Sequence, residues 1–223
     1  MHPAQQTHPF APDGWFPVEL SQHVPEGLVV QSMLLGQELA LWRSAAGSVQ
    51  AWENRCPHRS VRLTLGFVVD DQLVCRYHGW RYGRDGRCTS VPSTPTLAPP
   101  PTACVRTYMC RESDGVVWAS LARAPRAYPP RVPGLVACRS FTLDGAFEVV
   151  TNTVETAGFA PAGEPTVWCE AAGKTDVATL LLQPMDACTT GVHLFISETL
   201  ATAHRIAAAG RIKALFAKEP CHV

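Results

Sequence analysis

The sequence lacks any excess of charge of one sign and any long apolar stretch. Lysine and arginine together number 19, as do aspartate and glutamate, so the formal net charge is zero. A neutral chain has no general electrostatic attraction for nucleic acid or for an anionic membrane surface, so we expect neither as a partner. There is also no apolar run of about 18 residues, the length that a membrane-spanning helix needs.

The first residues lack the features of a secretory signal. Residues 1–17 contain no lysine, no arginine and no apolar core segment, all of which a signal peptide combines. We therefore expect a cytoplasmic protein in which residues 1–13 form a flexible lead-in. The nine cysteines are scattered along the chain, unlike those of a compact secreted disulfide scaffold, so reduced thiols are expected for most of them.

The first half of the chain contains short apolar runs separated by turn residues. Such spacing predicts a small all-β domain over residues 14–121. Residues 122–133 then hold four prolines and three arginines, a composition that predicts a linker over residues 122–139. The expected strands include residues 28–30, 33–35, 39–42, 49–52, 67–69, 73–74 and 116–119.

Residues 140–223 have the pattern of a second, α+β domain. Residues 177–183 and 191–196 predict paired strands, and residues 146–150 begin either a strand or a helix. Residues 198–218 carry apolar side chains at helical spacing and predict an amphipathic helix. The apolar positions of that helix are Leu200, Ala203, Ile206, Ala207, Ile212, Leu215 and Phe216.

Two cysteine–histidine pairs form the strongest motif in the sequence. Cys56 and His58 form the first pair, and Cys75 and His78 follow after sixteen intervening residues. Two facing loops of this kind place two thiolates on one iron and two imidazoles on the other, as in a Rieske-type [2Fe–2S] cluster. A structural zinc is the alternative, but zinc sites usually pair cysteine with cysteine in one knuckle and histidine with histidine in the other.

These motifs resemble the Rieske domain of Rieske non-haem iron oxygenases, with the vanillate O-demethylase-like α subunits as the nearest branch. The matching segments are Cys56-Pro-His-Arg, Cys75-Arg-Tyr-His-Gly-Trp-Arg-Tyr and Gly86-Arg-Cys88. The resemblance is strong over residues 14–121 and weaker beyond them. It implies a small β-sandwich with a two-loop cluster-binding tip, followed by a helix-grip-like α+β domain that is here truncated.

The second domain departs from the family at the mononuclear iron site. The family motif Asn-x-x-Asp-x-x-His-x-x-x-x-His matches Asn152, Glu155, Gly158 and Gly163. Glu155 keeps the acidic group that bridges cluster and iron between subunits in the family, whereas glycine replaces both ligand histidines. No acidic residue between Thr199 and Lys218 can provide the third ligand. We therefore expect no mononuclear Fe(II).

A basic collar surrounds the cluster motif and suggests how electrons arrive. Seven arginines stand against three aspartates between positions 55 and 87. Such a surface suits the docking of an acidic donor, a ferredoxin or a flavin/iron–sulfur reductase. The arginines are Arg55, Arg59, Arg62, Arg76, Arg81, Arg84 and Arg87.

Three functions are compatible with these features. The first is a Rieske-type component that transfers single electrons, for which a catalytically complete oxygenase subunit is a candidate partner; the family resemblance implies trimers. The second is an active oxygenase for a small aromatic compound with a non-standard iron site, for which His193, Glu198 and His204 are candidate ligands. The third is a non-catalytic redox sensor. The catalytic residues and the substrate stay unknown at this stage.

The sequence also predicts the reduction potential. Respiratory Rieske proteins have an extra cysteine in each loop and a serine after the His-Gly pair, and these places hold Val61, Arg76 and Trp80 here. Fewer hydrogen bonds to the sulfurs destabilise the more negative reduced state, so we expect a potential near the low end of the Rieske range, about −150 mV. Potentiometric titration measures it, and a value well above zero would contradict the expectation.

Overall fold

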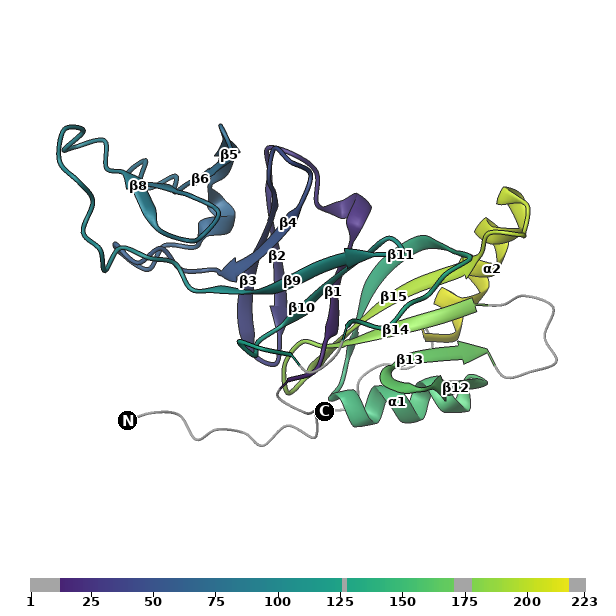
Figure 1. Cartoon of the computed structure of the whole chain (residues 1–223). Coiled ribbons are helices and arrows are strands. Elements are labelled where there is room, and N and C mark those ends of the chain that lie inside the picture. Colours follow the sequence, from purple (N-terminus) through teal and green to yellow (C-terminus); the bar gives the residue numbers. More distant parts are fainter. Residues whose placement is uncertain (1–12, 126–127, 171–177, 217–223) are drawn as a thin grey trace.

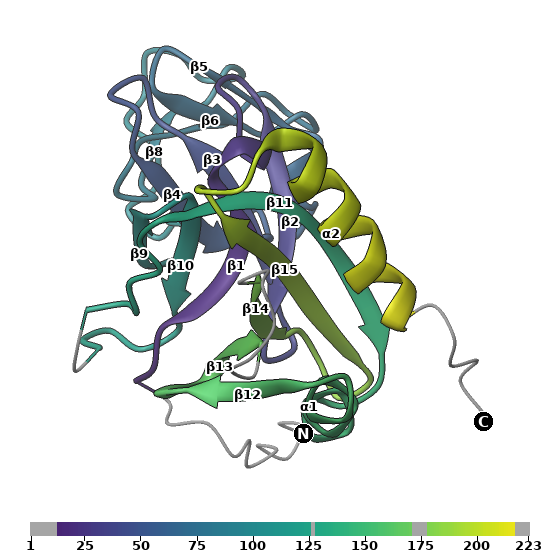
Figure 2. The ribbon, with the colours of Figure 1, turned by 90° about the vertical axis from the view of Figure 1, so that its right-hand side faces the viewer.

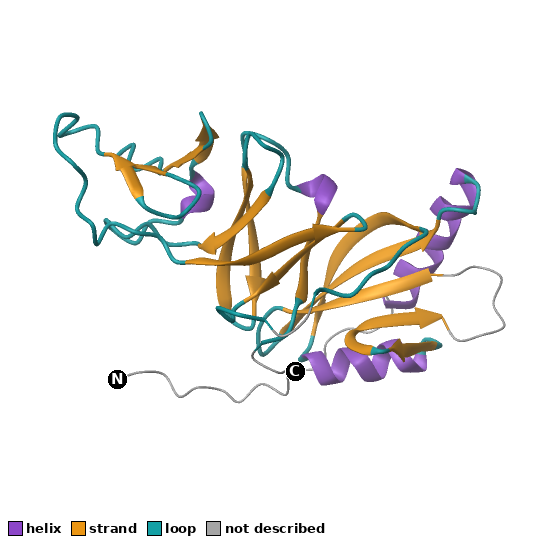
Figure 3. Ribbon diagram, in the orientation of Figure 1, coloured by secondary structure: helices purple, strands orange, loops and turns teal. Residues whose placement is uncertain are grey.

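The computed structural model describes residues 13–125, 128–170 and 178–216, and its three antiparallel sheets form an elongated molecule (Figure 1). Strands dominate the described part, and one α-helix precedes and one follows the last four strands in chain order (Figure 3). Apart from Asp13, the predicted lead-in lies outside the described residues. None of the described helices is long and apolar enough to cross a membrane.

A six-stranded sheet forms the centre of the N-terminal domain. Its order is β1-β10-β9-β4-β3-β2, with 3-10 helix η1 (Ser21–His23) after β1. Strand β3 is covered on both faces, because Leu39 and Leu41 enter one core while Ala40 and Trp42 enter another. The strands are β1 (Phe16–Leu20), β2 (Val29–Leu34), β3 (Gln37–Arg43), β4 (Val49–Glu53), β9 (Thr107–Ser113) and β10 (Val116–Ser120).

A smaller four-stranded sheet carries the cysteine–histidine loops. Its order is β5-β6-β7-β8, and 3-10 helix η2 (Leu63–Leu65) precedes it. Asp70 and Asp71 both have positive φ, 50° and 61°, as a two-residue hairpin turn requires. The strands are β5 (Phe67–Val69), β6 (Gln72–Val74), β7 (Arg81–Tyr82) and β8 (Cys88–Ser90).

The C-terminal domain is a five-stranded sheet with both helices on one face. Helices α1 and α2 share a core with the alternate residues of β14 and β15, among them Leu180 and Leu194. Figure 2 shows α2 lying along β11. The order is β11-β15-β14-β13-β12. The elements are β11 (Leu135–Asp144), α1 (Phe147–Thr156), β12 (Phe159–Ala162), β13 (Glu164–Glu170), β14 (Ala178–Pro184), β15 (Thr189–Ser197) and α2 (Thr202–Phe216).

The other face of this sheet packs on the N-terminal domain. Leu181 and Phe195 meet Leu20 and Trp118 in a shared core. Polar contacts cross the same boundary, because the Gln183 amide Nε2 donates to the Met33 carbonyl at 2.6 Å and to the Ser32 hydroxyl at 3.0 Å. The α+β fold predicted for the second half is therefore confirmed, and it forms one continuous structure with the β domain.

Several predicted boundaries differ from the structure. Residues 28–30 and 33–35 do not flank a break, since β2 runs through both and the Ser32 hydroxyl donates to the Val18 carbonyl at 2.7 Å. Residues 147–150 form the start of α1, and Ala146 precedes the helix with an extended backbone. The predicted linker 122–139 is too long at its C-terminal end, because β11 begins at Leu135 and pairs with β15.

The predicted helix over residues 198–218 is present as α2, but its buried face was predicted wrongly in part. Ala208, Ala209, Ile212 and Phe216 are buried. Ile206 is 69% exposed and Leu215 is 45% exposed. The predicted positions Ala203 and Ala207 are also exposed, so the buried face is rotated from the predicted one and shares with it only Ile212 and Phe216 within α2.

Gly86 offers a test of how tightly the cluster sheet joins the central sheet. Its φ is +80°, and a Cβ there would collide with the Val105 carbonyl, which lies on the chain leading into β9. We expect Gly86→Ala to lower the free energy of unfolding by about 1–3 kcal/mol more than the control Gly47→Ala. Gly47 has φ +82° but nothing within 4 Å of its Cβ position. Urea unfolding measures both, and equal losses would contradict the collision.

Candidate metal centre

The two cysteine–histidine loops, 56–61 and 75–80, have the same backbone geometry. In each, the cysteine N–H donates to the carbonyl five residues later, Val61 or Trp80, at 2.9 Å. The fourth residue after the cysteine donates back to the cysteine carbonyl, and it has positive φ: 55° for Ser60 and 69° for Gly79. The loops are therefore two copies of one turn.

This turn aims backbone amides at the sulfur atoms. The N–H groups of His58 and Arg59 donate to the Cys56 sulfur, and those of Tyr77 and His78 donate to the Cys75 sulfur. Amide donors stabilise negative charge on sulfur. The backbone of each loop therefore stabilises a thiolate by itself, without a bound metal.

The two sulfurs lie side by side in the apolar core beneath the loops. Cys56 and Cys75 are each 2% exposed. A hydrogen bond from the Cys75 thiol lowers the pKa of Cys56 to about 5, and the same shared proton, together with burial, raises the pKa of Cys75. The Tyr82 hydroxyl lies 3.1 Å from the Cys56 sulfur, and burial raises the pKa of that phenol. Tyr82 therefore stays protonated and acts as a donor.

The two imidazoles form the outer half of the centre. The Nδ1 atoms of His58 and His78 are 3.2 Å apart. The His58 ring stacks on Trp80 of the other loop, with centroids 4.3 Å apart and planes at 9°. Tyr77 lies against His78, with centroids 3.9 Å apart. His78 is exposed, so the imidazole half is the part of the centre nearest solvent.

The four side chains therefore separate into a sulfur pair and a nitrogen pair. Among the described residues, no three histidine, cysteine or acidic side chains surround a point where a single ion would bind. A tetrahedral zinc needs its four ligands around one centre, whereas a [2Fe–2S] cluster with two cysteines and two histidines needs one pair at each iron. The donor set and its pairing fit the cluster.

Most of the basic collar is neutralised by carboxylates. Arg62 makes a two-point contact with Glu38, at 2.6 and 3.1 Å, and Arg55 lies 3.3 Å from the same carboxylate. These contacts hold the pKa of Glu38 below its usual range. Arg81, Arg84 and Arg87 make longer contacts with Asp70, Asp71 and Asp85. Within the described residues, Arg59 and Arg76 have no carboxylate partner.

The residues matching the mononuclear iron motif lie on and after α1. Asn152 and Glu155 are exposed on the helix. Gly158 has φ +94° and follows the helix end, and Gly163 has φ +85° in the turn between β12 and β13. Both glycines occupy left-handed backbone positions, which glycine adopts without strain. These positions contribute turns and no ligand side chains.

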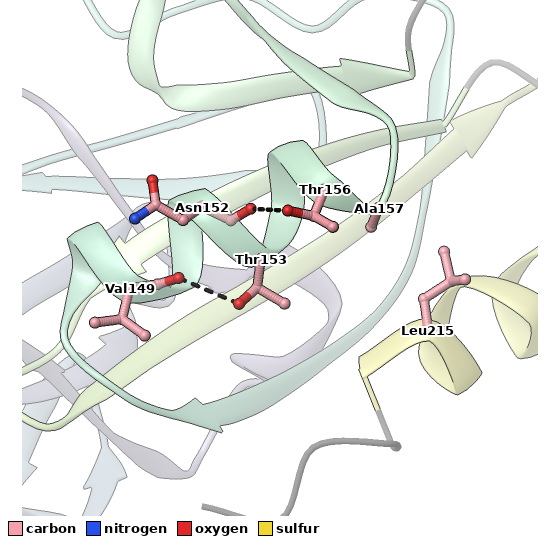
Figure 4. Close-up of a pocket in the computed structure, with 6 residues that line it drawn as sticks. All are labelled: Val149, Asn152, Thr153, Thr156, Ala157 and Leu215. Carbon is pink, nitrogen blue, oxygen red and sulfur yellow. Dashed lines mark hydrogen bonds between the residues drawn. The ribbon is translucent and has the colours of Figure 1, made fainter.

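A cavity of about 370 Å³ opens beside Asn152, between α1 and Leu215 of α2 (Figure 4). Its threonine hydroxyls are used within the helix: Thr153 donates to the Val149 carbonyl at 3.2 Å and Thr156 to the Asn152 carbonyl at 2.9 Å. The cavity therefore offers few free polar groups for chemistry.

The candidate ligands of an altered iron site do not come together. His193 is buried, and both of its ring nitrogens have partners: Ser140 at 2.8 Å and Gln183 at 3.0 Å. Burial lowers its pKa to about 4. Glu198 and His204 are both exposed. Glu198 follows the end of β15, and His204 lies on α2. His193 is a structural histidine at the interface between the two domains.

Comparison with known proteins agrees with this geometry. Residues 14–108 match the family model of the Rieske [2Fe–2S] domain. The oxidoreductase NdmD of Pseudomonas putida is 47% identical over 112 residues, which are 50% of this chain and 19% of NdmD. The chloroplast protein TIC 55 of Arabidopsis thaliana is 33% identical over 139 residues, 62% of this chain and 25% of TIC 55. The chain thus spans a quarter or less of these relatives.

Solved structures extend the likeness to both domains. The chain superposes on NdmA of Pseudomonas putida CBB5 with a TM-score of 0.71 at 20% identity, covering 92% of this chain and 79% of NdmA. Apo dicamba monooxygenase gives 0.72 at 17% identity, covering 90% and 81%. At this identity the likeness establishes the fold. By their match to the family model, residues 14–108 form a Rieske [2Fe–2S] domain, and over both domains the chain has the fold of NdmA and dicamba monooxygenase.

Sequence reasoning missed the hydrogen bond from Tyr82 to the Cys56 sulfur. Tyr82 is the buried residue of the two-residue strand β7, and it pairs with Leu73 of β6. The sequence signal for the contact is the tyrosine itself at a position that the strand buries. A buried tyrosine usually has a partner for its hydroxyl.

We expect Tyr82→Phe to lower the reduction potential. The phenol stabilises the more negative reduced state, and losing one hydrogen bond to a charged sulfur changes a one-electron potential by about 40–60 mV. Tyr108→Phe is the matched control, because Tyr108 is buried in the central core and its hydroxyl has no partner in the described structure. Redox titration followed by visible absorption compares the variants. An unchanged potential in Tyr82→Phe would remove Tyr82 from the tuning of the cluster.

Proposed function

We propose that this protein is a single-electron transfer component in which Cys56 and Cys75 bind one iron of a Rieske cluster and His58 and His78 bind the other. The observation that carries the proposal is the separation of the four side chains into a buried sulfur pair and an outer nitrogen pair, 3.2 Å apart at Nδ1. A bound Rieske cluster accepts and gives up one electron at a time.

The surrounding residues would insulate one end of the centre and open the other. The sulfur pair lies over Trp42, Trp52 and Leu73, which exclude water. A low-dielectric surrounding of this kind controls solvent access and redox potential. His78 reaches solvent, and Tyr77 beside it is 59% exposed. Electrons would therefore enter and leave through the imidazole edge.

Arg59 and Arg76 would guide the donor to this edge. They directly follow His58 and Cys75 in the sequence, and their charges are not balanced by a carboxylate of the described residues. Opposite charge on a partner speeds encounter and favours one orientation. This arrangement supports a ferredoxin or a reductase domain with an acidic surface as donor. Cytoplasmic location is part of the same proposal.

We further propose that the second domain has lost the mononuclear iron site of the oxygenases it resembles in fold. Gly158 and Gly163 serve turns where ligands would stand, and His193 is occupied by Ser140 and Gln183. The domain would then act in assembly. Glu155 supports this role, because an acidic side chain in the last turn of a helix gains nothing from the helix dipole and is free to face another subunit, such as a catalytically complete one in a trimer.

Metal counting with electron paramagnetic resonance tests both parts. We expect two irons per chain, and we expect His58→Ala and His78→Ala to lose the Rieske signal because the second iron loses a ligand. His204→Ala, an exposed histidine on α2, is the control and should keep the signal. If the protein held a third iron and needed it for activity, the proposed loss of the mononuclear site would be wrong. A native signal in both histidine variants would overturn the ligand assignment.

A further inference from the structure

A second cavity, of about 340 Å³, opens where three separate elements of the chain meet. η1 of the Rieske domain, strand β11 and helix α2 each contribute to it, and Figure 2 shows the last two running side by side. It is distinct from the cluster loops and from the cavity beside Asn152. Its lining residues are His23, Cys138, Arg139, Ser140, Phe141 and Lys213.

The cavity opens beside β11, which is an edge strand of its sheet. The pairing of β11 with β15 shifts register between Ala137 and Arg139 and is regular from Arg139 onward. In a regular strand successive side chains point to opposite faces. Residues 138–141 all line the cavity, which therefore extends across the open edge of β11.

The charge around the cavity is positive. Arg139 and Lys213 line it, and Arg205 lies near enough to act on the Cys138 thiol. Glu19 is the nearby carboxylate, and its Oε1 already accepts from the Leu20 N–H at 2.9 Å and lies 2.9 Å from the His23 ring. Among the described residues no carboxylate pairs with Arg139 or Lys213. Arg139 and Lys213 are therefore two permanent cations at the cavity wall, whereas the Arg205 guanidinium nearby donates to the Glu198 carbonyl at 3.3 Å and to the Thr202 hydroxyl at 3.1 Å.

Such a group of cations is best stabilised by an anion with several oxygens. Arginine presents a planar fork of donors that matches a carboxylate or a phosphate, and lysine adds a compact charge. The Ser140 hydroxyl is a further polar group at the wall, while Phe141 and Cys138 offer apolar surface for a small ligand body. Without an anion, the like charges of β11 and α2 repel each other across the cavity.

We propose that this cavity binds a small oxyanion, a phosphate or carboxylate ligand, at the boundary between the two domains. Arg139 and Lys213 hold its charge. His23 comes from the Rieske side of the boundary and Lys213 from the last turns of α2, so the ligand connects both parts of the chain. Ser140 joins this site to the interface, since its hydroxyl contacts Glu19 at 3.2 Å and His193 at 2.8 Å.

Isothermal titration of the cluster-loaded protein tests the proposal. Sodium phosphate and sodium citrate are titrated separately, with sodium chloride holding the ionic strength constant. We expect saturable binding of one equivalent of at least one of the two. Arg139→Gln and Lys213→Gln should each weaken it at least tenfold. Arg123→Gln removes the same charge at an exposed position outside the cavity and should leave the affinity unchanged.

The choice of anions identifies the ligand chemistry. Binding of phosphate alone assigns a phosphate ligand, and binding of citrate alone assigns a polycarboxylate. No saturable binding of either anion overturns the proposal, as does native affinity in both cavity variants. The visible spectrum of the cluster in each variant shows that the chain is folded, and because both side chains are exposed their loss should leave that spectrum intact.

Discussion

The adjacency of two buried sulfur atoms is the constraint on which the N-terminal domain depends. Cys56 and Cys75 come from loops nineteen positions apart, and each loop must make the same turn for the sulfurs to meet. The core beneath them, built around Trp42, Trp52 and Tyr82, is apolar and does not stabilise an unpaired charge. A buried thiolate pair is costly unless a metal shares its charge. The small sheet helps to hold this pair in place, because Leu73 of β6 and Tyr82 of β7 share its core.

The packing of the second domain does not depend on the residues that match the mononuclear iron motif. Its sheet packs on two sides, with one face under α1 and α2 and the other against the Rieske domain. These contacts do not involve Asn152, Glu155 or the two glycines of the iron motif. Packing and ligand identity are separate requirements, so substitutions at the motif leave the architecture in place.

The sequence predicted the features that depend on local spacing. The two cysteine–histidine loops, the paired strands β14 and β15 and the presence of α2 all follow from nearby residues. What it missed depends on long-range packing. Alternation could not show that β3 is buried on both faces, nor could helical periodicity decide which side of α2 meets β11. The bond between Tyr82 and Cys56 joins residues 26 positions apart, a distance at which spacing carries no information.

The shared core between the two domains limits how this Rieske domain can be reused. Trp118 and Leu20 are fully covered only because Leu181 and Phe195 lie over them. A chain cut after β10 would present these side chains to water as one apolar face. Moving the domain into a different protein would therefore require a neighbouring domain with a complementary apolar surface. The alternative is to replace the apolar side chains of β1 and β10 on this face with polar ones. Whether such a domain can be transferred to another protein therefore depends on this shared core rather than on the cluster loops.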